Sequence, residues 1–157
     1  MVNPWLHLLS LTAFLGALIG LWLILLPALS AVQQHAQKVE LLARGLKFYN
    51  PLQIGALGVV LLSGAFHLTE LKAAYREMFI THLGSTLGPK LVLSFFLILV
   101  AVYQSMGVGH RFVKRHEGGE SVSPEELSAV VRRLKRSTWL LLLLALITLW
   151  VGLGLRR

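Results

Sequence analysis

The chain has 157 residues, of which 55% are hydrophobic and only 14% are charged, and its mean hydropathy is +0.70. This composition argues against an ordinary soluble domain and favours a membrane protein. Cysteine is absent, which excludes disulfides, thiolate metal sites and a thiol nucleophile.

Four long runs of the sequence, residues 1–34, 48–69, 91–109 and 137–155, contain no Asp, Glu, Lys or Arg. The hydrocarbon core of a bilayer takes about 20 apolar helical residues to cross, and each run meets or nearly meets that length. We therefore expect an all-α, integral membrane four-helix bundle that forms a single domain and is multi-pass in the inner (cytoplasmic) membrane. The expected helices cover residues 4–29, 50–71, 89–109 and 124–155.

The first helix is expected to begin at Asn3 and Pro4, a capping residue followed by a first-turn proline. Its apolar stretch exceeds the roughly 7–15 residues of a signal-peptide core, so we interpret it as a retained helix. Residues 30–49 mix leucine and valine with charges, which is typical of a short interfacial helix or a helix extension. Asn50 and Pro51 are then expected to start the second helix.

Residues 69–88 place apolar side chains on one helical face and are expected to lie on the membrane interface. Gly88 and Pro89 open the third helix. The segment from Ser123 to Glu126 has the pattern of a capping box, with proline at the first helical position. It predicts a helix that continues into the fourth span without a break.

The net charge of +8 is distributed unevenly along the chain. Ten of the 15 basic residues follow the first and third helices, and five lie on the opposite side. The positive-inside rule then places these two loops in the cytoplasm, and both termini and the second loop outside. In this interpretation, the excess basic residues set the orientation in the membrane and contact anionic lipid headgroups, and a nucleic-acid partner is not expected.

His7 and His67 are the histidines that fall inside the expected spans, and four crossings put them at the same outer depth. An ionisable ring at that depth is costly and is a candidate functional group. Neutral imidazole binds haem iron and copper, and two ligands from facing helices hold a haem in many bundles. Ser63 and Gly64, one turn before His67, would let a flat ligand approach the backbone. The plain alternatives are an interfacial His7 and a His67 that bonds to a neighbouring helix.

Three other residues could join this site. His82 and Met78, in the second loop, could contribute to a metal site, although a single interfacial histidine more often has a structural role. Lys90 opens the third helix, where it could extend to the headgroups, pair with a haem propionate or act as a ligand. The remaining histidines lie among basic residues and are interpreted as solvated: His35, His110 and His116.

Short stretches of the sequence resemble a known family. Residues 5–9, 14–16 and 25–29 resemble the opening helix of the copper-resistance protein D (CopD) family. The stretch from Leu87 to Leu93, followed by an apolar helix that ends at Arg111, resembles a later helix of the same family. The resemblance implies a four-helix membrane protein that handles copper. The chain has only three methionines, which departs from the Met and His clusters expected for copper passage.

The positions of His7 and Lys90 also resemble those of HemJ-type protoporphyrinogen oxidases, in which an early histidine and a lysine opening the third helix are functional and haem is bound. The chain departs from that type at residues 27–30, where Pro-Ala-Leu-Ser replaces Pro-Arg-Leu-Phe. His35 alone lies near the expected second histidine.

These observations lead to three expected functions. The first is a membrane redox protein with haem b held by His7 and His67, which exchanges electrons with a quinone or a redox protein partner, or oxidises a porphyrinogen-like substrate. The second is a CopD-type copper-handling protein whose site would use His7, His67, Met78 and His82. The third is a non-catalytic anchor subunit of a respiratory complex. Either a homo-oligomer or a complex subunit is compatible with each of them.

Overall fold

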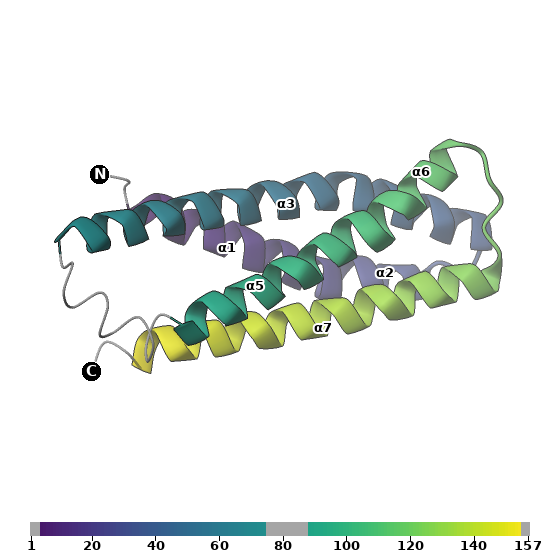
Figure 1. Cartoon of the computed structure of the whole chain (residues 1–157). Helices are drawn as coiled ribbons and strands as arrows, with labels where there is room; N and C mark the ends of the chain where they lie inside the picture. The colour runs from purple at the N-terminus through teal and green to yellow at the C-terminus, as the bar shows by residue number, and fades with distance from the viewer. Residues whose placement is uncertain (1–3, 75–87, 155–157) are drawn as a thin grey trace.

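The computed structural model describes the backbone of residues 4–74 and 88–154, and the side chains of residues 5–66 and 88–151. The described chain forms an all-α bundle of four long helical rods (Figure 1). Each rod contains a segment long and apolar enough to cross a membrane: Trp5–Ala31, His35–Phe66, Gly88–Glu117 and Pro124–Val151. The expected four-helix membrane bundle is therefore confirmed, and the chain is a multi-pass membrane protein.

The first rod consists of α1 (Pro4–Gly20), the π-helical turn η1 (Leu21–Leu25) and α2 (Leu26–Ala31). The π-turn immediately precedes Pro27. Proline has no N–H and its ring collides with the carbonyl of the preceding helical turn, so a regular α-helix is disfavoured there. The wider turn, in which the Leu26 N–H donates to the Leu21 carbonyl, accommodates the proline without ending the rod.

The second rod is a single helix, α3 (His35–Ala74), which continues through Pro51. The prediction that Asn50 and Pro51 start a new helix is therefore wrong, and the helix-extension alternative for residues 35–49 is correct. The physical reason is a buried stripe at helical spacing on this extension, which packs against the other rods. Burial of this stripe outweighs the one hydrogen bond lost at the proline. The stripe comprises Val39, Leu42, Ala43, Leu46 and Tyr49.

The third rod consists of α5 (Gly88–Val102), the π-helix η3 (Tyr103–His110) and α6 (Arg111–Glu117), so it extends beyond the expected end at residue 109. The fourth rod is α7 (Pro124–Gly154). Its start confirms the predicted capping box. The Ser123 N–H donates to Glu126 Oε2, and the Glu126 N–H donates to Ser123 Oγ, both at 3.2 Å.

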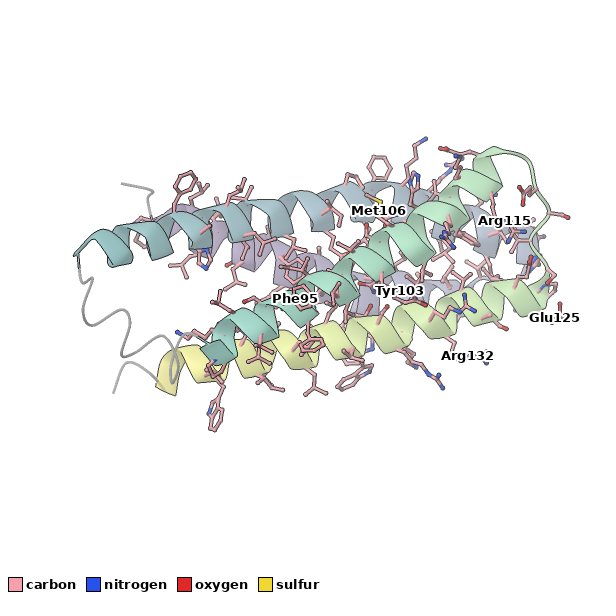
Figure 2. All side chains as sticks on the ribbon, in the orientation of Figure 1. Phe95, Tyr103, Met106, Arg115, Glu125 and Arg132 are labelled. Atoms are coloured by element: carbon pink, nitrogen blue, oxygen red, sulfur yellow. The ribbon has the colours of Figure 1, made fainter. Side chains whose placement is uncertain are left out.

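The two ends of the bundle differ in charge. We call the end that carries the connections 32–34 and 118–123 the basic end, and the opposite end, where α1 begins and α7 finishes, the terminal end (Figure 1). Figure 2 shows Phe95, Tyr103 and Met106 along the apolar part of the third rod, and Arg115 and Glu125 at the basic end. At this end, Lys47 pairs with Glu117 at 2.7 Å.

Among the described side chains, the tightly packed ones lie at the basic end and in the middle of the bundle. One core cluster joins all four rods near the basic end, and a second, which includes Phe14, Ala101 and Leu141, lies in the middle. Toward the terminal end, the last buried side chains among those described are Ser10, Ser63, Ala101 and Ala145. In Figure 1, the α1–α3 pair and the α5–α7 pair lie apart at that end.

Candidate functional site

His7 and Ser63 connect α1 and α3 near the terminal end. His7 Nδ1 lies 2.8 Å from Ser63 Oγ. The Ser63 hydroxyl is directed at two carbonyl oxygens of its own helix, those of Val59 at 2.6 Å and Val60 at 3.0 Å. A hydroxyl has a single proton, and Ser63 donates it to its own helix. The oxygen can then accept a hydrogen bond from the His7 ring, an arrangement that corresponds to the imidazole tautomer with its proton on Nδ1.

This arrangement determines the chemistry available to His7. A neutral histidine protonated on Nδ1 carries its lone pair on Nε2, which is the nitrogen that can then coordinate a metal. Metal-binding histidines commonly donate the other ring N–H to a fixed acceptor, which holds the ring in one orientation. Ser63 is such an acceptor, and its side chain is 2% exposed.

Gly64 provides the surface on which the His7 ring rests. A Cβ atom added at Gly64 would lie 3.6 Å from His7 Cε1, which is an ordinary van der Waals contact. The structure therefore brings together three of the predicted site residues: His7, Ser63 and Gly64. The space beside Gly64, which we expected to admit a flat ligand, contains the imidazole of His7.

The structure describes less of the other predicted site residues. The backbone of His67 lies one turn beyond Ser63 in α3, and its side chain is outside the described residues, as are Met78 and His82. Lys90 is half-buried at the start of α5 and has no hydrogen bond or ion pair to a described residue. The described part of the chain contains no group of three or more His, Asp or Glu side chains that could hold a metal ion.

The histidines interpreted as solvated include two with specific partners. His35 Nε2 lies 2.7 Å from the Val122 carbonyl oxygen, and His116 Nε2 lies 2.8 Å from Glu40 Oε2. The His116 contact joins α6 to α3, the His35 contact joins α3 to the 118–123 connection, and both lie at the basic end. His110 is exposed.

A buried polar cluster inside the bundle was not predicted from the sequence. Gln104, in η3, donates from Nε2 to Thr138 Oγ1 on α7 at 2.6 Å. Its Oε1 accepts from Gln53 Nε2 at 3.0 Å and from the Tyr49 hydroxyl at 3.5 Å, both on α3. Gln53, Gln104 and Thr138 are fully buried. The cluster therefore links three rods through neutral hydrogen bonds between buried side chains.

The surroundings of the cluster contain further polar atoms. Asn50 Oδ1, Gln53 Oε1 and Ser105 Oγ are buried and have no hydrogen-bond partner within the described residues. The Asn50 amide lies against Gly109, where an added Cβ would approach Asn50 Oδ1 to 2.5 Å. π-helical segments such as η3 often occur at functional sites. The sequence signal was two glutamines inside uncharged helical runs, which a search for charged residues passes over.

The two sites differ in what they can do chemically. The His7 site can supply one imidazole ligand, whereas the Gln104 cluster lacks an ionisable carboxylate or imidazole and orders the packing of three rods. No protein-family model, curated protein or solved structure matches the chain. The resemblance to the CopD family and to HemJ-type oxidases accordingly stays a prediction from the sequence.

Proposed function

We propose that this chain is a membrane redox protein that binds a b-type haem at the terminal end of the bundle, with His7 and His67 as the axial ligands. It would exchange electrons with a membrane quinone or a redox protein partner, or oxidise a porphyrinogen-like substrate. The observation that carries the proposal is the hydrogen bond between His7 Nδ1 and Ser63 Oγ. When bound, the haem supplies one-electron chemistry at its iron.

The role of the chain's own residues follows from the contacts described above. Ser63 Oγ would accept a hydrogen bond from the Nδ1–H of His7, which favours the tautomer that coordinates through Nε2. Gly64 allows the ring to lie close to the α3 backbone. His67 follows Ser63 by one helical turn, so its Cα lies on the same side of α3 as the residues that meet His7.

The low burial of the described α5 side chains toward the terminal end also supports a bound apolar macrocycle. None of the described side chains of α5 between residues 88 and 100 is buried, although a helix within a packed bundle buries a stripe along its whole length. Apolar side chains of α3 and α5 are exposed at this level, among them Leu62, Phe66, Phe95 and Phe96. Lys90, at the start of α5, is assigned to a propionate, because burial of a carboxylate without a cation is costly.

The experiment that tests the proposal is pigment and metal analysis of the purified protein, with a reduced-minus-oxidised spectrum. We expect stoichiometric haem b with a low-spin spectrum. His7→Ala and His67→Ala should each remove most of the haem or convert it to a high-spin form. The matched controls, His35→Ala and His116→Ala, should retain the spectrum because those rings bond at the basic end.

Ser63→Ala and Lys90→Gln refine the test. Loss of the acceptor at Ser63 should weaken haem retention by about 10–100-fold, the usual cost of removing an outer partner of a ligating histidine. Lys90→Gln should shift the haem potential, whereas Lys90→Arg should largely preserve it. A low-spin spectrum that survives both His7→Ala and His67→Ala would contradict the ligand assignment. Stoichiometric copper without haem would favour the CopD-type function, and absence of both would favour an anchor subunit.

A further inference from the structure

Three side-chain oxygen atoms inside the bundle are buried and have no hydrogen-bond partner within the described residues. They are Asn50 Oδ1 and Gln53 Oε1 on α3, and Ser105 Oγ on η3. Buried polar groups in folded proteins are nearly always hydrogen-bonded, either to the protein or to an internal water molecule. Three such oxygens on two adjacent helices therefore point to a partner that the helices share.

The three oxygens lie where α3 and η3 face each other. Asn50 and Gln53 are three residues apart on one side of α3, with their Cβ atoms about 5–6 Å apart. A Cβ atom added at Gly109 would lie 2.5 Å from Asn50 Oδ1, so these two residues face each other. The two helices run in opposite directions (Figure 1). Ser105 precedes Gly109 by roughly one helical turn, which brings it to the level of Gln53. The hydrogen bond from Gln53 to Gln104, the residue before Ser105, agrees with this level.

The hydrogen-bond network determines which atom of Gln53 is left over. Gln104 Nε2 faces the Leu134 carbonyl oxygen at 3.4 Å and Thr138 Oγ1 at 2.6 Å. Because a carbonyl oxygen can only accept, the nitrogen of Gln104 must be on that side, and its Oε1 accepts from Gln53 Nε2 at 3.0 Å. The atom of Gln53 that remains is therefore the acceptor Oε1.

The three groups together offer two acceptors and one donor. The amide oxygens of Asn50 and Gln53 can only accept, whereas the Ser105 hydroxyl has a proton to donate. Ser137 donates its hydroxyl proton to a carbonyl oxygen of its own helix at 2.9 Å, but Ser105 makes no such bond to a described residue. A buried water molecule typically makes about three hydrogen bonds. One water can donate to both amide oxygens and accept from Ser105, which satisfies all three groups.

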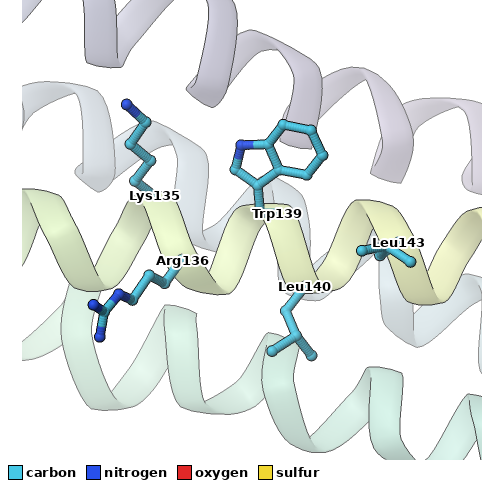
Figure 3. Close-up of a pocket in the computed structure, with 5 residues that line it drawn as sticks. All are labelled: Lys135, Arg136, Trp139, Leu140 and Leu143. Atoms are coloured by element: carbon cyan, nitrogen blue, oxygen red, sulfur yellow. The ribbon is translucent and has the colours of Figure 1, made fainter.

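The charges around the site favour a neutral ligand over a cation. The glutamate side chains that the structure describes lie at position 40 and between positions 117 and 126, at the basic end. On α7, the charged residues nearest to Thr138 are Lys135 and Arg136, which are exposed and extend to opposite sides of the helix (Figure 3). A cation beside Gln53 would thus be buried within a membrane span without a described carboxylate to neutralise it, which is costly.

We propose that α3 and η3 share a binding site for an internal water molecule. The water donates to Asn50 Oδ1 and Gln53 Oε1 and accepts from the Ser105 hydroxyl. It extends the contact between Gln53 and Gln104 toward the basic end, and it holds the π-helical segment to α3 by additional hydrogen bonds. The site goes beyond the haem proposal and uses none of the same residues.

Proton-detected solid-state NMR of the protein in lipid bilayers tests the site directly. We expect a dipolar cross peak at the water frequency for the side-chain amide of Gln53. The backbone amide of Leu141, which is fully buried in the middle core cluster, is the control and should lack this peak. Ser105→Ala removes one of the three partners of the water and should weaken the Gln53 peak.

The effect of Ser105→Ala on stability provides a second test. If the hydroxyl donates to a bound water, its removal should lower the folding equilibrium constant by about 2–10-fold, the ratio for one net hydrogen bond. If the hydroxyl has no partner, its removal should stabilise the bundle, because a buried unpaired polar group is costly. Ser137→Ala is the matched control, since Ser137 is also buried but donates within its own helix.

The outcomes that would overturn the proposal are distinct. One is the absence of the Gln53 cross peak in the wild type, and another is a Ser105→Ala variant at least as stable as the wild type. Unfolding is also measured in sodium chloride and in choline chloride, and we expect equal midpoints. A midpoint that rises with sodium alone would overturn the proposal in favour of a bound cation. Helicity by circular dichroism checks that each variant is folded.

Discussion

Replacement of Gln104 by methionine should destabilise the bundle through the loss of hydrogen bonds and not through a change of side-chain volume. The two side chains have similar volume and flexibility, so the substitution removes hydrogen bonds while it retains packing. Gln104 bonds to Thr138 at 2.6 Å and to Gln53 at 3.0 Å, and all three side chains are fully buried. After the change, the Gln53 amide N–H and the Thr138 hydroxyl lose their partner on η3.

The expected magnitude follows from these contacts. A buried donor left without a partner costs about 1–3 kcal/mol. Thr138→Val removes the other side of the 2.6 Å bond with little change of shape and should cost about 1 kcal/mol. Hydrogen bonds between membrane helices contribute about 0.6 kcal/mol on average and at most about 1.7 kcal/mol in double-mutant cycles. We therefore expect a coupling free energy between Gln104 and Thr138 of about 0.6–1.7 kcal/mol.

The assay is reversible unfolding in mixed micelles, with helicity followed as the denaturing detergent increases. The four proteins of the cycle are the wild type, Gln104→Met, Thr138→Val and the double variant. Thr148→Val is the matched control, because the Thr148 hydroxyl donates within its own helix, to the Leu144 carbonyl at 2.7 Å. Gln104→Met and Thr148→Val should be additive. Additivity of Gln104→Met with Thr138→Val as well would refute the claim that this bond joins η3 to α7 in the folded bundle.

Three other predictions use separate parts of the structure. Gly109→Ala should lower the free energy of unfolding by about 1–3 kcal/mol, because the new methyl group displaces the Asn50 amide. The control is Gly16→Ala, where no atom lies within 4 Å of the added Cβ, and this variant should change thermal unfolding little. Ser123→Ala should cost about 1 kcal/mol of local helix stability, seen as faster amide exchange in the first turns of α7, and unchanged exchange would contradict the capping role. A reporter at Gly118 should be cytoplasmic, and its labelling by an impermeant reagent in intact cells would reverse the orientation.

The four spans and the start of α7 could be predicted because their signals are local. An uncharged run of sufficient length and a serine followed three residues later by glutamate each determine structure within one segment. The start of α3 could not be predicted in this way. The local signal at Asn50 and Pro51 favours a helix start, but the buried stripe of the preceding segment decides the outcome through contacts with other rods.

The side-chain contacts of the two candidate sites could not be predicted from local sequence signals either. Equal depth of His7 and His67 was predicted from the length of the spans, and the structure places Ser63, one turn before His67, against His7. The hydrogen bond and the resulting tautomer depend on how α1 and α3 are rotated about their axes, which the sequence does not specify. Prediction of the Gln53–Gln104 contact would likewise require the rotation of the second and third rods about their axes.

The length of α3 has a mechanical consequence. Its 40 residues extend over about 60 Å, whereas the hydrocarbon core is about 30 Å thick. One unbroken helix therefore crosses the bilayer and projects well beyond it, and contacts with α6 through Lys47 and Glu117 hold the projecting part at the basic end. A change in the tilt of α3 at one membrane surface must move the helix at the other surface. A helix of this length therefore connects the proposed site at the terminal end with the basic end through one continuous backbone.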